Sequence, residues 1–325
     1  MLILNATEVR RVLPMEIAID TVATAYAAVS RAESLTPLRT PMELPHGTIL
    51  AMPAYLMPTG TAGVKIVSVF PDNPTHGLPT ITGLMILLDG SSGVPLAAMD
   101  AAALTAIRTG ASGGVAADYL ARRDANVVAL IGAGVQGRTQ LQAVAAVRGV
   151  SEIRIYDVNP ENADSLIRDM EHGSSARFDR CDTAAAAVRG ADVILCATTA
   201  SLPVFSAGDL QPGVHVTGVG SFHPGMAEIG ADTLKRANRI VVDSREACLE
   251  EAGDFIQPIC RGEITADVIN SEIGEIVTGD RPGRSTEEEI TVFKAVGLAA
   301  LDVAVAQTTY CRALDRGMGT QVSME

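Results

Sequence analysis

A glycine-rich turn is the first feature of the chain whose residue types and spacing indicate chemistry. Gly132, Gly134 and Gly137 form a G-x-G-x-x-G pattern that follows the apolar stretch NVVALI and opens a helical segment. At this spacing the first glycine makes a tight turn, the second lets the backbone approach a pyrophosphate, and the third allows close helix-to-strand packing. The helix N-terminus adds free N–H groups and a positive dipole end, which favour phosphate. The pattern therefore predicts a dinucleotide site.

An acidic residue stands where such a site needs one for a ribose. Asp157 ends the next strand-like stretch, EIRIYD, 25 positions after Gly132, close to the spacing of roughly 20 that is typical of this role. A carboxylate there repels a 2′-phosphate, so NAD(H) is favoured, with NADP(H) left open because the neighbouring Asn159 is uncharged. The alternative is that the glycines make only a tight turn and that Asp157 caps a loop.

Two basic residues lie in apolar surroundings. Lys65 is inside the stretch GVKIVSVF, where an unpaired ammonium group is costly. Arg108 lies on an Ala-rich helical segment whose neighbours are of the type that is buried, so it too needs an anionic partner. The alternative for any single Lys or Arg is an exposed surface charge.

Two patterns divide the chain into regions. From Thr48 to Asp100, four β-like stretches separated by short turns favour antiparallel pairing, with helices expected over 14–31 and 100–122. From Asn126 onward, continuous apolar strands alternate with helices, which is typical of a parallel sheet with right-handed crossovers. We expect an α/β protein with a Rossmann domain over 119–298 and an α+β domain over 1–118 and 299–325. The Ala-rich segment 287–312 is expected to return to the α+β domain.

Composition narrows the classes of partner. With 25 basic and 38 acidic residues the net charge is −13, which repels phosphate backbones and anionic membrane surfaces. Aromatic residues are only 3% and Trp is absent, so there is little to stack on bases. Small molecules are therefore favoured as ligands over nucleic acid.

Cysteine use and hydropathy bear on the compartment. The five cysteines are scattered without a C-x-x-C pair, which fits a reducing compartment and argues against a zinc site, so no metal is expected. No stretch reaches the roughly 18 apolar residues of a membrane span, and the N-terminus lacks a signal-peptide pattern. We expect a cytoplasmic protein.

Four stretches together resemble one protein family. These are GVKIVSVFPDN (63–73), TAIRTGA (105–111), IGAGVQG (131–137) and ITVFKAVG (290–297). In this order they resemble the ornithine cyclodeaminase and mu-crystallin family, and the resemblance covers nearly the whole chain. It implies a substrate-binding and dimerisation domain, made from the N-terminal region and the C-terminal helix, with an inserted Rossmann domain that binds NAD(P), in a homodimer.

The family's activities turn on a carbon–nitrogen double bond beside a carboxylate. They are cyclodeamination of ornithine or lysine, reversible deamination of alanine, and reduction of cyclic ketimines such as Δ1-pyrroline-2-carboxylate. Some members bind small molecules or serve structurally as crystallins. A small-molecule imino or amino acid is therefore the implied substrate.

The resemblance also assigns roles to residues. It implies that Arg39, Lys65 and Arg108 hold the substrate carboxylate, for which Arg offers a planar fork and Lys a compact charge. Met52 matches a residue of the pocket wall, with core filling as its alternative. The positions implied to contact the cofactor are Thr80, Arg108, Gly132, Gly134, Val135, Gln136, Gly137, Asp157, Thr198 and Val219. For the two threonines the alternative is a strand-end hydrogen bond.

One position departs from the family pattern. Cyclodeaminases carry an Asp two residues before the Pro-Gly that follows the fifth Rossmann strand, and here that segment is GSFHPG (220–225), with Phe222 at the position. A phenyl ring can neither accept a proton nor pair with a distal ammonium, so ornithine and lysine become poor substrates. An apolar wall suits the ring methylenes of a cyclic imino acid. Ser221 or His223 are candidates for relaying a proton, and the sequence orients neither.

The sequence thus favours one reaction among several. We expect NAD(P)H-dependent reduction of Δ1-pyrroline-2-carboxylate or Δ1-piperideine-2-carboxylate to L-proline or L-pipecolate. The alternatives are an ornithine or lysine cyclodeaminase with a substituted base, an alanine-dehydrogenase-like deaminase, and an NAD(P)-dependent binding protein with little turnover. A carboxylate clamp of three cations beside a nicotinamide site argues against the last of these.

Overall fold

The chain divides into two compact units. The computed structural model describes residues 1–323, and one unit comprises Met1–Arg108 with the chain from Leu298 onward, while the other comprises Thr109–Gly297. The expected boundaries lie ten residues later at the first junction and one residue later at the second. The first junction falls inside a long helix, α3 (Ala101–Leu120). The roles assigned to the two domains stay predictions.

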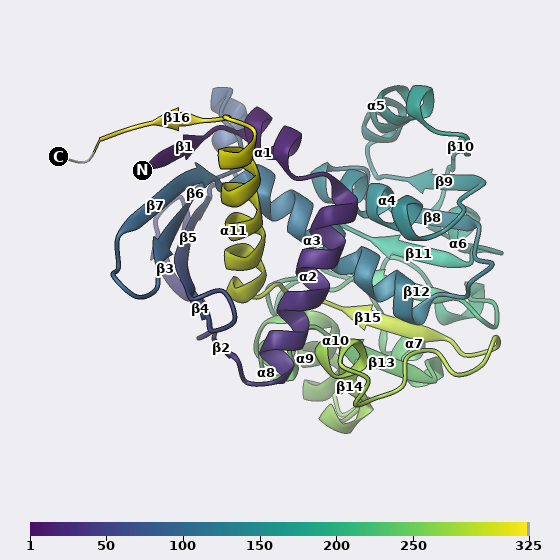
Figure 1. The fold of residues 1–325 in the computed structure, drawn as a ribbon. Coiled ribbons are helices and arrows are strands. Elements are labelled where there is room, and N and C mark those ends of the chain that lie inside the picture. Colours follow the sequence, from purple (N-terminus) through teal and green to yellow (C-terminus); the bar gives the residue numbers. More distant parts are fainter. Residues whose placement is uncertain (324–325) are drawn as a thin grey trace. The chain divides into compact units, whose positions relative to one another are not determined.

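The first unit is built on a mixed sheet of eight strands (Figure 1). The strand order is β16-β1-β7-β6-β5-β4-β2, and β3 pairs with β4. Its strands are β1 (Leu2–Leu4), β2 (Ser34–Leu35), β3 (Thr40–Leu44), β4 (Gly47–Leu56), β5 (Thr61–Val69), β6 (Ile81–Asp89), β7 (Pro95–Asp100) and β16 (Thr320–Gln321). The predicted antiparallel pairing of β4 to β7 is confirmed. The short strands β1, β2, β3 and β16 had no recognisable pattern, and β1 runs parallel to β7.

Helices cover one face of this sheet. They are α1 (Ala6–Val12), α2 (Met15–Ser30) and α11 (Ala299–Asp315), and α1 starts at a capping box made by Asn5 and Glu8. Helix α11 packs against α2 and against strands β4 and β5. Side chains alternate along β5, so residues such as Lys65 and Val67 face the helices and are buried, whereas Ile66 is exposed.

The second unit contains a parallel sheet of eight strands in the order β10-β9-β8-β11-β12-β15-β13-β14. Its strands are β8 (Val127–Ile131), β9 (Glu152–Tyr156), β10 (Arg177–Arg180), β11 (Val193–Cys196), β12 (His215–Gly218), β13 (Arg239–Val242), β14 (Ser271–Glu272) and β15 (Thr291–Lys294). Its helices are α4 (Val135–Val147), α5 (Pro160–Met170), α6 (Ala184–Val188), α7 (Ala231–Arg236), α8 (Arg245–Glu251), α9 (Gly253–Cys260) and α10 (Ile273–Val277). The predicted Rossmann-type α/β fold is confirmed.

The segment 287–312 was expected to return to the α+β domain, and the structure divides it. Residues 299–312 lie in α11 of the first unit, whereas residues 291–294 form β15, between β12 and β13 in the parallel sheet. All four residues of β15 are buried. The sequence pattern of a short, fully buried strand cannot be distinguished from the beginning of the Ala-rich helix that follows it.

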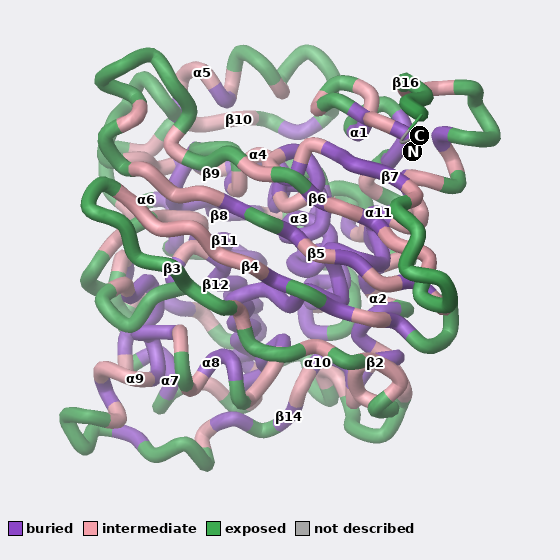
Figure 2. The backbone as a smooth tube through the Cα atoms, turned by 90° about the vertical axis from the view of Figure 1, so that its left-hand side faces the viewer, coloured by how far each residue is buried: buried purple, intermediate pink, exposed green. Residues whose placement is uncertain are grey.

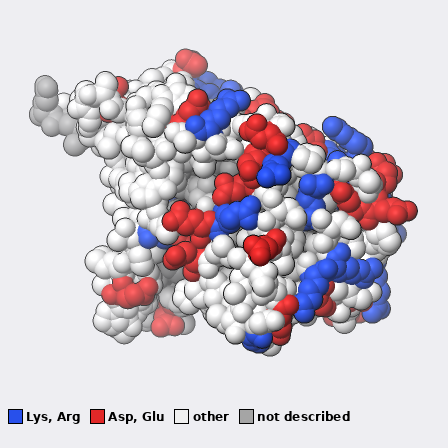
Figure 3. All heavy atoms as spheres, turned by 90° about the horizontal axis from the view of Figure 1, so that it is seen from below, with Lys and Arg blue, Asp and Glu red and all other residues white. Residues whose placement is uncertain are grey.

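The surface and the helices add two observations. On the face shown in Figure 3, acidic and basic side chains intermingle. Within residues 1–323 no single helix is long and apolar enough to cross a membrane. Helices α1 and α2 taken together pass by length and composition, but the chain bends by 84° between them.

Candidate active site

Two buried cations of the first unit share one buried carboxylate. Lys65 on β5 donates from Nζ to Asp302 Oδ2 at 2.7 Å, and Arg108 on α3 donates from Nε to Asp302 Oδ1 at 3.0 Å. Lys65 is 2% exposed, Arg108 6% and Asp302 0%. These are the only hydrogen bonds that either cation makes to the part of the chain that the structure describes. Further N–H donors of both side chains are therefore left over for a ligand.

The charges of this group act on one another. Burial lowers the pKa of Lys65, Asp302 opposes that shift, and the charges of Arg108 and Arg39 add to it, which leaves the pKa at about 8. Burial by itself raises the pKa of Asp302, but the two cations outweigh it and hold that pKa below its usual value. Asp302 is thus a carboxylate, and the pair of cations around it keeps a net positive charge.

The strand register fixes the surroundings of Lys65. Met52 on β4 and Met85 on β6 lie directly opposite Lys65 on either side, and Met99 on β7 lies opposite Met85. All three methionines are buried. The Lys65 side chain therefore projects from a row of apolar side chains. Met52 is buried in this row and also borders Lys65, so its position is compatible with core packing and with a wall of the Lys65 site.

The remaining predicted residues of this unit lie on loops. Arg39 lies just before β3 and is half-buried, close enough for its charge to affect the pKa of Lys65. Thr80 lies just before β6, and its carbonyl oxygen accepts a hydrogen bond from Phe70 N at 2.8 Å. A cofactor contact for Thr80 stays a prediction.

Asp302 is the residue that sequence analysis missed. It stands in the apolar helical run LAALDVAVA, and a single acidic residue among Ala, Leu and Val was the available signal. Arg108 was expected to need an anionic partner, and Asp302 is that partner. The two lie 194 positions apart in the chain, so no local spacing rule joins them.

The glycine turn of the second unit has the geometry that a pyrophosphate requires. Gly132 has φ +96°, and a Cβ there would lie 2.5 Å from Ala197 O. A Cβ on Gly134 would meet open space, and Gly134 starts α4 without any side-chain cap. The buried Oε1 atom of Gln136 has no hydrogen-bond partner within residues 1–323. Free N–H groups and open space at one helix start fit a dinucleotide phosphate, whereas the Gln136 oxygen can only accept and would need a donor such as a hydroxyl group.

Asp157 supports this turn from the end of β9. Its Oδ2 accepts a hydrogen bond from Ala133 N at 2.7 Å, and its Oδ1 accepts one from Asn159 N at 2.8 Å. The carboxylate therefore fixes the glycine turn, as the alternative interpretation held. A carboxylate can accept about four hydrogen bonds, so capacity for a ribose hydroxyl remains and both roles are compatible.

The loops after β11 and β12 carry the other predicted residues of this unit. Val219 is buried and donates from its backbone N to Cys196 O at 3.0 Å, and Thr198 follows β11. Phe222 is 36% exposed. The Ser221 hydroxyl donates to Met226 O at 2.8 Å, so its proton is already engaged, and His223 is exposed with Nδ1 accepting from Gly225 N. Neither side chain is arranged as a proton relay in this unit.

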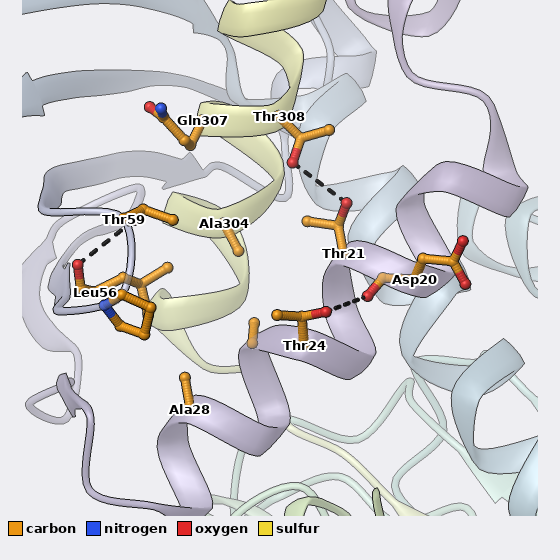
Figure 4. Close-up of a pocket in the computed structure, with 11 residues that line it drawn as sticks. Asp20, Thr21, Thr24, Ala28, Leu56, Thr59, Ala304, Gln307 and Thr308 are labelled. Atoms are coloured by element: carbon orange, nitrogen blue, oxygen red, sulfur yellow. Dashed lines mark hydrogen bonds between the residues drawn. The ribbon is translucent and has the colours of Figure 1, made fainter.

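Two other features of the chain do not compete with this site. Within residues 1–323 no three His, Cys, Asp or Glu side chains come together as a metal cluster. A hollow of about 280 Å³ in the first unit lies between α2, α11 and the turn after β4 (Figure 4). Its lining is mostly small or hydroxyl-bearing, and Asp20 is the charged residue among those that line it. The described residues that line it include no Lys or Arg that could bind an anionic substrate.

Fold and site together define a two-unit α/β protein, with a Rossmann unit and a second unit that holds a buried cationic site. The chain belongs to the Ornithine cyclodeaminase/mu-crystallin family, whose profile matches residues 1–317. The chain is 40% identical over 324 residues to a Δ1-pyrroline-2-carboxylate reductase of Bacillus cereus, covering 99% of each chain.

Solved structures agree with this assignment. The Δ1-pyrroline-2-carboxylate reductase of Thermococcus litoralis, solved in complex with NADH and L-proline, has a TM-score of 0.96 and 38% identity over 99% of this chain and 100% of that one. An archaeal alanine dehydrogenase dimer with bound NAD has a TM-score of 0.93 and 37% identity over 100% of this chain and 99% of that one.

Proposed function

We propose that this protein is an NADH-dependent ketimine reductase that converts Δ1-pyrroline-2-carboxylate or its six-membered analogue into L-proline or L-pipecolate. One observation carries the proposal: Lys65 and Arg108 are both buried and share a single carboxylate, so the site has one more positive than negative charge. Buried charge without a partner is costly, and an anionic ligand relieves that cost. The similarity to reductases that act on this substrate class supports the choice of ligand.

The two cations suit different atoms of an α-imino acid. The free Nη groups of Arg108 form a planar fork that matches the two carboxylate oxygens. The Lys65 ammonium is compact, and the imine nitrogen lone pair points to the same side as the nearer carboxylate oxygen. One ammonium group can therefore donate to both atoms. Arg39, on its loop beside this group, adds a third positive charge toward the carboxylate.

Lys65 is also the candidate proton donor. When bound, NADH would supply the hydride for C2 of the substrate, whose carbon–nitrogen double bond would become single. Lys65 Nζ donates a proton to the imine nitrogen, is left as a neutral amine, and regains a proton from water. Because its pKa lies at about 8, Lys65 is charged near neutral pH yet releases a proton more readily than an ordinary lysine. This assignment makes Lys65 and Arg108 the catalytic residues.

The cofactor is held by the turn around Gly134 and by Asp157. The open space over Gly134 accommodates phosphate, and the α4 N-terminus favours its charge. Asp157 accepts from the ribose and repels a 2′-phosphate, which favours NAD(H) over NADP(H). Thr80, Val135, Gln136, Thr198 and Val219 complete the proposed cofactor contacts.

The proposed assembly is a homodimer formed by the sheet face that lies opposite the helices. Apolar side chains of that face are exposed, with Met42 at 52%, Ile66 at 39% and Leu84 at 44%. Strand β3 is exposed along its whole length (Figure 2). Exposed apolar surface of this kind is typical of a protein–protein interface. We place the protein in the cytoplasm, because all five cysteines are free thiols.

A three-substrate assay tests the proposal. Purified protein with NADH and enzymatically generated Δ1-pyrroline-2-carboxylate should show rapid loss of the nicotinamide absorbance. Ornithine with NAD⁺ should release little ammonia, and pyruvate with ammonia and NADH should react much more slowly. Comparable ammonia release from ornithine would instead identify a cyclodeaminase, and faster reduction of pyruvate with ammonia would identify an alanine dehydrogenase.

A further inference from the structure

A second buried charge cluster lies in the Rossmann unit. Lys294, the last residue of β15, lies with Nζ 3.1 Å from Asp254 Oδ2 and 4.0 Å from Glu228 Oε2. None of these side chains is more than 1% exposed. Lys294 was predicted neither as a site residue nor as part of a network, although it interrupts the apolar run ITVFKAVG in the way that Lys65 interrupts GVKIVSVF.

Glu228 joins the loops that follow two neighbouring strands. Its Oε1 accepts a hydrogen bond from Thr198 N at 2.5 Å, just after β11, and its Oε2 accepts from Gly220 N at 2.7 Å and Ser221 N at 3.2 Å, just after β12. Burial raises the pKa of Glu228, and the Lys294 charge and the N–H donors that face both oxygens oppose that shift. Asp254 in turn accepts from Glu228 N at 2.7 Å, so the cluster fixes the Glu228 backbone by a hydrogen bond, and Lys294 attracts its side chain at 4.0 Å.

The two loops touch backbone to backbone where Glu228 holds them. A Cβ on Gly220 would lie 2.1 Å from Thr198 O and 2.4 Å from Thr198 N. On its other side Thr198 meets the glycine turn, since a Cβ on Gly132 would lie 2.9 Å from Thr198 Cγ2. The glycine turn, the loop after β11 and the loop after β12 are therefore in contact with one another at the carboxyl ends of three neighbouring strands, β8, β11 and β12.

These three segments have a defined place in a dinucleotide site. In a doubly wound fold the dinucleotide lies across the carboxyl ends of the strands, with one half of the sheet for each nucleotide. Because the glycine turn and Asp157 belong to β8 and β9, the nicotinamide half falls to β11 and β12. We propose that Glu228, held by Lys294 and Asp254, is a positioning residue that fixes the loops at Thr198 and Gly220 as the platform for the nicotinamide. This inference rests on the proposed use of NADH.

Comparing two ligands isolates this role. NADH uses both halves of the site, whereas ADP-ribose has the adenine half and lacks the nicotinamide. The substitution Glu228→Gln preserves size but turns one acceptor into a donor that faces backbone N–H groups. We expect the dissociation constant of NADH to rise by about tenfold or more, while that of ADP-ribose changes by less than about twofold. Isothermal titration calorimetry of the purified variant without substrate measures both constants.

Asp192 provides a matched control in the same unit. It is a buried carboxylate that accepts from Asn126 N and Val127 N at 3.0 Å each and pairs with Arg122. It lies just before β11, at the amino-terminal ends of the strands, away from the cofactor loops. Asp192→Asn should lower the thermal unfolding temperature and leave the ratio of the two dissociation constants unchanged. A general destabilisation of the unit would instead raise both dissociation constants by a similar factor.

A second variant tests the same role if Glu228→Gln does not fold. Gly220→Ala keeps the Glu228 residue but introduces a methyl group that would lie 2.1 Å from Thr198 O and 2.5 Å from Glu228 Oε1, so it must separate the loops and displace the carboxylate that joins them. It should therefore reproduce the selective loss of NADH affinity. Equal weakening of NADH and ADP-ribose in a folded variant, or no weakening of either, would overturn the positioning role. Wild-type protein that binds ADP-ribose but not NADH would overturn the proposed function as well.

Discussion

Lys65 Nζ lies 2.7 Å from Asp302 Oδ2, although the two residues are 237 positions apart and both side chains are buried. An ion pair in such a place is expensive to desolvate, and loss of one partner leaves an uncompensated charge. Arg108 shares the same carboxylate, so Asp302 neutralises only one of two cations. The arrangement holds Lys65 and Arg108 in fixed positions while leaving a positive charge for a ligand.

The Lys65–Asp302 pair predicts a pH profile. Lys65 carries its proton below its pKa of about 8 and loses it above, so kcat/KM for a cyclic ketimine should fall on the alkaline side of about pH 8. Asp302 raises the pKa of Lys65, and Asp302→Asn should therefore move this fall to lower pH. Profiles of kcat/KM between about pH 6 and pH 10 measure the shift. An unchanged alkaline limb in Asp302→Asn would exclude Lys65 as the titrating group.

Arg108→Ala tests the carboxylate clamp. Loss of a buried, charge-paired anchor should lower kcat/KM by an amount that corresponds to about 3 kcal/mol or more of lost transition-state stabilisation. Arg108→Lys is the matched variant, because it retains the charge and loses the planar fork, and it should recover only part of the rate. Steady-state kinetics with varied ketimine at saturating NADH give both values. A loss below about 0.5 kcal/mol in Arg108→Ala would remove Arg108 from the clamp.

The sequence was sufficient for the glycine turn of the Rossmann unit because the signals of that turn are local. Three signals follow one another closely in the chain: the strand NVVALI, the glycine pattern and Asp157. The geometry of a dinucleotide turn restricts which residue types can stand at these positions. The four antiparallel strands β4 to β7 were predictable for the same reason, since turn residues separate them. Strands β3 and β16 were not predictable, because they are short and their residues are exposed.

The charge networks were predictable only in part. Burial of Lys65 and Arg108 followed from their apolar neighbours, and so did the need for an anion. The identity of that anion did not follow, because Asp302 comes from a helix near the other end of the chain. The same limit applies to Lys294, whose partners lie on segments brought together only by the sheet order. The local sequence thus indicates which buried cations need an anionic partner, but the partner itself is determined by how distant segments pack in the fold.

Phe222→Asp should weaken the reductase without producing a cyclodeaminase. A carboxylate in place of the phenyl ring removes apolar surface suited to ring methylenes and adds a group that can pair with a distal ammonium. We expect slower reduction of Δ1-pyrroline-2-carboxylate and little ammonia release from ornithine, because one carboxylate does not by itself orient the amine for ring closure. Phe222→Leu serves as the apolar control. Efficient cyclodeamination by Phe222→Asp would show that this position alone decides the reaction.

Asp157→Asn should reduce the preference for NADH over NADPH. The amide removes the charge that repels a 2′-phosphate and keeps one acceptor for Ala133 N, whose hydrogen bond supports the glycine turn. The ratio of kcat/KM for NADH to that for NADPH should fall by about tenfold. Asp157→Ala also removes the support of the turn, so it should bind both cofactors less tightly. An unchanged ratio in Asp157→Asn would place cofactor selection elsewhere.

Ile66→Lys should separate the proposed dimer. Ile66 lies opposite Leu84 in the register of β5 and β6, on the sheet face away from α11, and the two side chains are 39% and 44% exposed. A lysine ammonium at the centre of that face would have to be desolvated against a second copy without a partner charge, whereas it costs little on a monomer in water. Light scattering coupled to size-exclusion chromatography should give a dimer for the wild type and a monomer for Ile66→Lys. Leu202→Lys, at a position 72% exposed in the other unit, should leave the dimer intact. A monomeric wild type, or an Ile66→Lys variant that still dimerises at low micromolar concentration, would show that this face does not form the interface.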